Sequence, residues 1–178
     1  MYLPRTRTRP FLLLHLAAAF YLWSPKAMST PPSTQVRSFH LDAPVARVFP
    51  LFTALGEKAW AEGWQPQLLS GREERGSVFR TVHGGRETTW IVVEYLPAEG
   101  RVSYARLAQD SNMGLVDVRC SAVPEGGTEV SVRYTLTGLD TRGDAFVSQF
   151  LDRAHYSRMI EEWHSSISAA LSRADAKR

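Results

Sequence analysis

Three side chains in the strand-forming part of the sequence could carry acid–base chemistry: His83, Glu94 and Tyr104. An imidazole, a carboxyl or a phenol can transfer a proton when a substrate lies within hydrogen-bond reach. His83 precedes a Gly-Gly turn and is expected at the mouth of a cavity. Glu94 would take part only on an inward face, where it would need a partner such as Arg106, because an isolated buried carboxylate is costly. Glu57 is interpreted as a solvated helix residue that could pair with a strand arginine.

The remaining histidines and the single cysteine do not form a metal site or a nucleophile motif. His155 and His164 lie nine residues apart, so a helix would place them on opposite faces, where they cannot bind one metal ion. Cys120 lies in an alternating segment on the same side as Val116 and Val118, which is typical of a small buried residue on a strand. The sequence contains no HExxH, GxSxG or Walker motif. We therefore expect no metal and no cofactor.

Large aromatic residues are numerous enough to line a cavity. Trp60 and Trp64 are four residues apart, which on a helix places both rings on one face. Aromatic rings also fill ordinary cores, so each of these residues has two interpretations. The hydroxyls of Tyr104 and Tyr134 could in addition orient a ligand. The expected ligand-binding residues are Trp60, Trp64, Phe79, Trp90, Tyr104, Tyr134, Phe146, Phe150 and Trp163.

The elements that must position these side chains are predicted from the period of the apolar residues. After an opening strand at residues 36–41, a period of two begins beyond Pro66. Short turns rich in glycine and proline separate the alternating segments, and such short connections permit only antiparallel neighbours. Trp90, Val92 and Glu94 share one face of their strand, and the sequence leaves open which face points inward. The six later strands are predicted at residues 67–70, 77–83, 86–96, 101–107, 114–123 and 129–139.

Helical periodicity appears on both sides of the strands. Asp42 and Pro44 are suited to begin a helical stretch over residues 45–61, which Pro50 and Gly56 should divide in two. An apolar stripe over residues 141–173 predicts one helix on the order of 50 Å long. We predict an α+β helix-grip fold, in which a curved antiparallel sheet of about seven strands wraps around the long C-terminal helix. A ligand can occupy the gap between helix and sheet.

Particular segments also resemble a known superfamily. They are residues 43–49 (APVARVF), residues 56–66 (GEKAWAEGWQP) and, further on, Thr89-Trp90, Glu94-Tyr95 and residues 160–163 (IEEW). Over residues 35–173 the chain resembles bacterial members of the START-like or Bet v 1-like (SRPBCC) superfamily, of the polyketide cyclase/dehydrase and lipid-transport type. The resemblance implies the helix-grip fold and a ligand cavity. It does not imply one chemistry, because this fold hosts carriers, cyclases, hydrolases and chaperone cofactors.

The net charge of +3 comes from the first 27 residues. These contain four basic residues and no acidic one, and without them the basic residues fall from 21 to 17, below the 18 acidic ones. A nucleic-acid binder needs clustered basic residues, so we expect no nucleic-acid partner. The length of 178 residues indicates one domain. We place a leader at residues 1–27, a disordered lead-in at 28–34, the domain at 35–174 and a tail at 175–178.

The leader has two interpretations. Residues 11–23 are mostly apolar, but a spanning helix needs about 20 such residues, so the segment matches the apolar region of a signal peptide. In that case the domain is exported. Alternatively translation starts at Met28 and the domain is cytoplasmic. In both cases we expect the functional protein to start near Met28, without a stable membrane span.

Two functions, and a weaker third, fit these features. The first is the binding or carriage of a small apolar, aromatic or lipid-like molecule in the cavity. The second is an enzyme of the cyclase or aromatase type that uses the same cavity. The third is a protein-binding module like a chaperone cofactor, which would show a wide exposed apolar patch. The expected partner is a small hydrophobic molecule, and the oligomeric state is left open.

Overall fold

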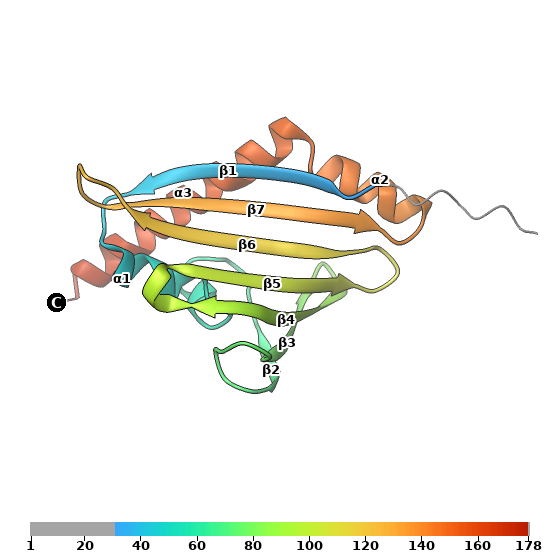
Figure 1. The fold of residues 1–178 in the computed structure, drawn as a ribbon, viewed down its shortest axis with the longest axis horizontal. Helices are drawn as coiled ribbons and strands as arrows, with labels where there is room; N and C mark the ends of the chain where they lie inside the picture. The colour runs from blue at the N-terminus through green and yellow to red at the C-terminus, as the bar shows by residue number, and fades with distance from the viewer. Residues whose placement is uncertain (1–30, 178) are drawn as a thin grey trace, which may run out of the picture.

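The computed structural model describes residues 31–177, so the predictions for the leader and for the start of the lead-in lie outside the described residues. Seven strands form one antiparallel sheet in the order β1-β7-β6-β5-β4-β3-β2, which confirms the predicted strand number and direction (Figure 1). The strands are β1 (Ser33–Leu41), β2 (Gln67–Ser70), β3 (Val78–His83), β4 (Arg86–Leu96), β5 (Arg101–Ala108), β6 (Asn112–Ala122) and β7 (Thr128–Gly138).

Turn chemistry fixes the order of the strands. Gly84 and Gly85, between β3 and β4, have φ values of 56° and 75°, a backbone region in which glycine avoids the steric cost that a Cβ would bring. Each strand from β2 to β7 pairs with the next one along the chain. β1 pairs with β7, from Ser33 opposite Leu136 to Leu41 opposite Thr128, and thereby joins the two ends of the sequence pattern.

The helical stretch after β1 is shorter and more irregular than predicted. It consists of α1 (Val45–Val48) and two 3₁₀ turns, η1 (Phe49–Phe52) and η2 (Gly56–Ala59). Pro50 and Gly56 do divide the stretch, as expected, but helix does not extend to residue 61. The predicted cap is wrong, because Pro44 occupies the N-cap position and the Asp42 carboxylate contacts His40 Nε2 at 3.1 Å.

The C-terminal helix is divided in two, which corrects the prediction of one continuous helix. α2 (Thr141–Phe150) begins after Asp140, whose carboxylate accepts a hydrogen bond from Gly143 N at 2.7 Å. Asp152 then caps α3 (Arg153–Asp175) by accepting from Ala154 N and His155 N, both at 3.0 Å. Two N-caps therefore replace one. No helix within residues 31–177 is both long and apolar enough to cross a membrane.

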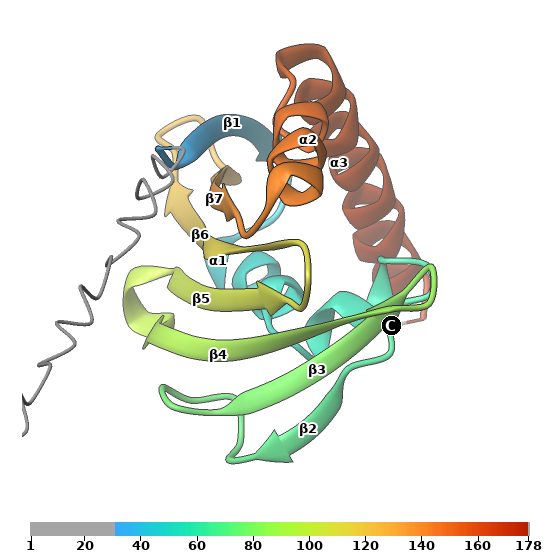
Figure 2. The same cartoon turned by 90° about the vertical axis from the view of Figure 1, so that its right-hand side faces the viewer.

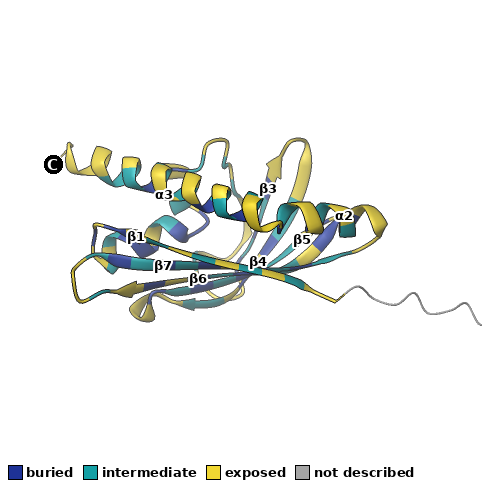
Figure 3. Cartoon of the chain, turned by 90° about the horizontal axis from the view of Figure 1, so that it is seen from above, coloured by how far each residue is buried: buried dark blue, intermediate teal, exposed yellow. Residues whose placement is uncertain are grey.

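Both helices lie on the concave side of the sheet, and Figure 2 shows the strands curving from β1 to β2 around that side. Buried residues gather where α3 crosses the sheet (Figure 3), and Val130, Val132, Ile160 and Ile167 are each at most 3% exposed. The Tyr156 hydroxyl donates to Val132 O at 3.0 Å and so ties α3 to β7. The alternate residues of β7 from Val130 to Leu136 thus form its inward face.

Candidate ligand-binding cavity

A cavity of about 270 Å³ lies between the sheet, α3 and the segment that connects η2 to β2. Most of the side chains around it are aromatic or aliphatic, and a few are polar or charged. Eight of the nine expected ligand-binding residues line it, and Phe146 does not. The lining includes Glu57, Trp60, Ala61, Trp64, Phe79, Thr81, His83, Trp90, Tyr104, Arg106, Val118, Tyr134, Phe150, Met159 and Trp163.

Trp60 and Trp64 reach the cavity from an irregular segment, because η2 ends at Ala59. The Trp60 indole N–H donates to Leu51 O at 2.7 Å, and that of Trp64 donates to Ala54 O at 2.8 Å. Each ring is therefore held by a backbone carbonyl of the preceding helical stretch, and its polar edge is satisfied. The two rings share the cavity, as their spacing predicted, although no helix places them there.

The floor of the cavity is a group of rings on three neighbouring strands. Phe79 and Trp90 are stacked, with centroids 5.8 Å apart and planes 3° apart, and Tyr104 meets both edge-on. The Trp90 N–H donates to Thr81 Oγ1 at 2.9 Å. The Tyr104 hydroxyl donates to Phe52 O at 2.8 Å, so it is already engaged in a structural bond. Burial raises the pKa of Tyr104 far above the usual value of a phenol.

A bulge in β4 decides where Glu94 points. Val92 pairs with Tyr104 and Glu94 pairs with the next residue back, Ser103, so Val93 has no partner on β5. The extra residue moves Glu94 to the opposite face from Trp90 and Val92. Its carboxylate lies 2.7 Å from the guanidinium of Arg101, outside the cavity. The assumption that Glu94 shares a face with Trp90 is therefore wrong, and its proposed partner Arg106 lies on the other side of the sheet.

Arg106 lines the cavity, although it was predicted only as a possible partner for Glu94. It follows Val102 and Tyr104 on the inward face of β5. Its guanidinium carbon lies 5.3 Å from the centre of the Trp90 ring, within the range of a cation–π contact. Its Nε is fully buried and has no hydrogen-bond partner among the described residues.

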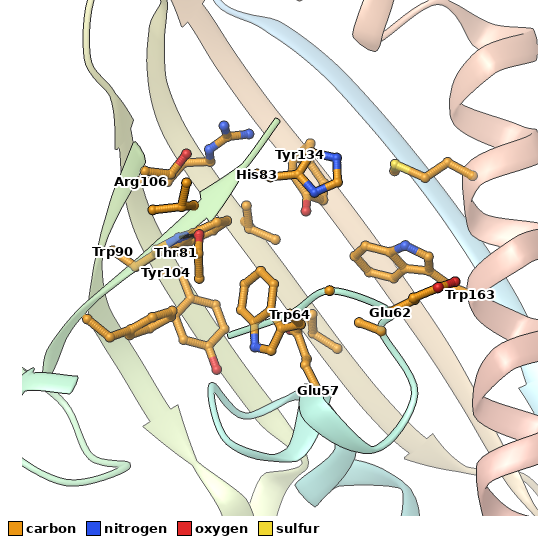
Figure 4. A pocket seen from close by; sticks show the side chains of 18 of the residues that line it. Glu57, Glu62, Trp64, Thr81, His83, Trp90, Tyr104, Arg106, Tyr134 and Trp163 are labelled. Atoms are coloured by element: carbon orange, nitrogen blue, oxygen red, sulfur yellow. Dashed lines mark hydrogen bonds between the residues drawn. The ribbon is translucent and has the colours of Figure 1, made fainter. Parts of the chain in front are cut away.

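Glu57 also lines the cavity, where it was expected in solvent. It is half-buried, and it forms no ion pair with another residue of the described chain, which corrects the expected pairing with a strand arginine. Burial raises the pKa of Glu57 well above the usual range of a glutamate. Figure 4 shows Glu57 and Arg106 on opposite sides of the cavity. The three-residue spacing from Glu57 to Trp60 was the signal that could have placed it here.

The remaining candidates come from several elements. His83 is exposed at the end of β3 and lines the cavity, as does Tyr134 on β7. Tyr134 packs edge-on against Trp163 of α3 and against Phe150. Phe146 stacks on Phe150 at 5.6 Å but lies outside the cavity wall.

Two further groups bear on the chemistry. Cys120 is buried, as predicted, and burial raises its pKa to about 12, which keeps the thiol protonated and unreactive at neutral pH. Within residues 31–177, no cluster of three His, Cys, Asp or Glu side chains is placed to hold a metal ion.

A family model described as polyketide cyclase/dehydrase and lipid transport matches residues 34–169 of this chain. That match spans β1 to most of α3, and therefore every element that lines the cavity. Among proteins with curated functional descriptions, none matches the chain.

Solved structures share the fold at low sequence identity. The aromatase/cyclase ZhuI from Streptomyces sp. R1128 has a TM-score of 0.61 and 16% identity, over 80% of this chain and 96% of that one. A major latex-like protein from Panax ginseng has a TM-score of 0.60 and 12% identity, over 79% and 97%. Norcoclaurine synthase from Thalictrum flavum has a TM-score of 0.58 and 8% identity, over 79% and 88%. At these identities the likeness concerns the fold alone.

Proposed function

This chain belongs to the polyketide cyclase/dehydrase and lipid transport family, and from that premise we propose that it binds a small aromatic molecule in the cavity. The observation that carries the proposal is the composition of the wall, in which rings of Trp60, Trp64, Tyr134 and Trp163 surround a space beside a few polar groups. Apolar walls with a few convergent polar groups are typical of ligand sites. Aromatic walls suit aromatic ligands because rings pack edge-on or in offset stacks.

The size of the cavity favours a small ligand over a long-chain lipid. Its volume of about 270 Å³ is just below the roughly 300–1,000 Å³ of pockets that bury drug-sized molecules. A molecule of one to three fused rings fits such a space. A lipid with two acyl chains does not, so within this family we favour the aromatic over the lipid-like ligand.

Native mass spectrometry of the protein purified from its own host tests this proposal. We expect a small aromatic molecule to remain bound to the natural chain. Ala61→Trp, which adds a ring to the cavity wall, should abolish this binding, whereas Ala59→Trp, on an exposed position outside the wall, should not. The proposal fails if the natural chain retains no molecule and binds none from a screen of aromatic and lipid compounds.

Glu57 supports a second function, an enzyme of the cyclase or aromatase type. A cavity carboxyl whose pKa burial raises well above its ordinary value is a candidate for proton transfer to or from a substrate. His83 at the cavity mouth is a second candidate for proton transfer. Tyr104 is a weaker one because its hydroxyl is bonded to Phe52 O, and Glu94 is no longer proposed because it lies outside the cavity.

The test of the enzyme function uses the molecule that the natural chain retains. If the chain converts that molecule, Glu57→Gln should slow the conversion by about 100-fold or more, the usual contribution of a general acid or base. Glu94→Gln is the matched control outside the cavity and should change the rate little. Equal rates for all three proteins would exclude Glu57 as a general acid or base. If the natural chain converts nothing, the enzyme function fails and only the binding function remains.

The outer face of the sheet supports the protein-binding alternative. Leu107 and Met113 are paired neighbours on β5 and β6, and both are exposed, as is Leu115 two residues further along β6. Apolar side chains grouped on a surface often mark a protein contact. Leu107→Lys combined with Leu115→Lys should abolish an interaction of this kind while leaving ligand binding unchanged. Loss of ligand binding in this variant would contradict the separation of the two faces.

A further inference from the structure

Arg106 is a half-buried cation of the cavity wall that has no carboxylate partner within residues 31–177. Its Nε is inaccessible and lacks an acceptor, and the ion pairs and hydrogen bonds found within residues 31–177 do not include its side chain. The outer arginines differ: Arg101 contacts Glu94 at 2.7 Å and Arg80 contacts Glu87 at 3.2 Å. These two outer arginines thus have carboxylate partners, whereas the inner Arg106 has none.

An arrangement of this kind is costly in the free protein. Removing a cation from water without a paired anion is unfavourable, and the contact with Trp90 offsets only part of that cost. Burial lowers the pKa of Arg106, but a guanidinium titrates so far above neutrality that it stays charged. The cavity therefore presents a permanent positive charge inside an aromatic wall.

The free N–H donors of the guanidinium restrict which anion can pair with it. Nε is inaccessible, so the two Nη nitrogens at the end of the planar fork are the donors left for a ligand, and a carboxylate accepts from both through two parallel hydrogen bonds. A single phenolate or carbonyl oxygen cannot align with both donors in that way. The adjacent wall carries the rings of Trp90 and Tyr134, so the body of the molecule that bears the carboxylate is expected to be aromatic.

Glu57 determines which way round an acidic ligand can lie in the cavity. It lies across the cavity from Arg106, with Trp64 and Trp90 between them in the view of Figure 4. An anionic group beside a second carboxyl would be repelled or would require a proton, whereas the same group beside Arg106 is attracted. An aromatic acid should therefore enter with its carboxylate toward β5 and its neutral end toward η2.

We propose that the cavity is specific for small aromatic carboxylic acids and that Arg106 binds their carboxylate through its two Nη nitrogens. This inference rests on the proposed function, since it names the chemical class that the cavity takes. Arg106 accounts for the difference in affinity between acidic and neutral molecules. The aromatic rings of the wall contribute the part of the affinity that acidic and neutral molecules have in common.

Calorimetric titration at pH 7.5 with two matched probes, naphthalene-2-carboxylate and naphthalene-2-carboxamide, tests the inference. The probes have nearly the same shape and differ in charge. The natural chain should bind the carboxylate at least about tenfold more tightly, because hydrogen bonds to a charged group contribute more than neutral ones. This comparison needs no substitution and so does not depend on the folding of a variant.

Arg106→Met should weaken carboxylate binding about 10- to 100-fold and change carboxamide binding less than about threefold. Arg106→Lys keeps the charge but loses the planar fork, so its affinity for the carboxylate should lie between those of the natural chain and Arg106→Met. Arg101→Met, on the outer face, is the control and should bind both probes as the natural chain does.

The outcomes separate the two proposals. Binding of both probes with equal affinity, or equal weakening of both by Arg106→Met, overturns the role of Arg106 while the cavity remains a binding site. Failure of the natural chain to bind either probe overturns the proposed function and this inference together.

Discussion

On the outer face of the sheet, Glu94 lies 2.7 Å from Arg101, and the Ser103 hydroxyl donates to Asp117 at 2.6 Å. On the cavity wall, Glu57 and Arg106 have no such partners within residues 31–177. Exposed pairs contribute little to stability because water solvates each partner nearly as well. Unpaired charges beside apolar rings are unfavourable, so the cavity wall carries a cost in stability that the outer face does not, as the proposed ligand site requires.

The largest difference between the two faces is expected for apolar side chains on β4. Trp90→Ala removes a ring that stacks on Phe79 and covers Arg106, and should lower the free energy of unfolding by about 3–5 kcal/mol. Ile91→Ala, on the neighbouring outward position, should lower it by less than about 1 kcal/mol, because Ile91 is 43% exposed. Urea denaturation measures both. Equal losses would mean that the inner wall is not packed as described.

The next difference concerns the two arginines of β5. Arg106→Met removes an unpaired buried charge and keeps an apolar chain against Trp90, so it should raise the free energy of unfolding by about 1–2 kcal/mol. Arg101→Met breaks an exposed pair and should change it by less than about 0.5 kcal/mol. Thermal and urea unfolding of the ligand-free proteins provide the comparison. A destabilised Arg106→Met protein would show that the cation is balanced within the fold.

The dependence of stability on pH should distinguish Glu57, on the cavity wall, from exposed glutamates. Burial raises the pKa of Glu57 in the folded state, so the folded chain holds this proton at pH values where the unfolded chain has lost it. As pH rises above about 4.3, the unfolded value, this carboxyl should therefore progressively lower the free energy of unfolding. Glu57→Gln should remove that decline.

Urea unfolding between pH 4 and pH 8 measures the effect at Glu57. Glu125→Gln, in the exposed turn between β6 and β7, is the control and should follow the natural chain over this range. Parallel curves for the natural chain and Glu57→Gln would show that Glu57 ionises as freely in the fold as in the unfolded chain.

The smallest difference separates two phenols of the cavity wall. Tyr104 donates to Phe52 O at 2.8 Å, whereas no hydrogen bond of the Tyr134 hydroxyl is found within the described chain. Tyr104→Phe should lower the free energy of unfolding by about 1 kcal/mol, the usual contribution of one hydrogen bond. Tyr134→Phe should change it by less than about 0.5 kcal/mol. Reversal of this order would indicate that Tyr134 holds the wall and that Tyr104 is free for a ligand.

Much of the fold could be predicted because it depends on local pattern. Turn formers bound each alternating segment, and the predicted strand 86–96 agrees with β4 (Arg86–Leu96) to the residue. The break between α2 and α3 was missed because the apolar stripe continues through it. Asp152 was the local signal for a second helix start, since aspartate at an N-cap satisfies free backbone N–H groups.

The site was predicted in its rings but not in its charges. The large aromatic residues could be named as candidates from sequence, but the alternation of the strands left open which face of the Trp90 strand points inward. The β4 bulge could not be inferred from sequence, because Val92 and Val93 are both apolar and the pattern does not show which one lacks a partner. That single residue exchanges the faces of Glu94 and Tyr95. Glu57 was misplaced because 3₁₀ turns replaced the regular helix from which its direction was inferred.

A crystal structure of the natural chain with naphthalene-2-carboxylate shows directly whether Arg106 binds a carboxylate inside the cavity. We expect the naphthalene ring in the cavity between Trp64 and Trp163, with its carboxylate about 2.8 Å from the two Nη nitrogens of Arg106. A molecule bound on the outer face of the sheet, or seated in the cavity with its carboxylate beside Glu57, would contradict it.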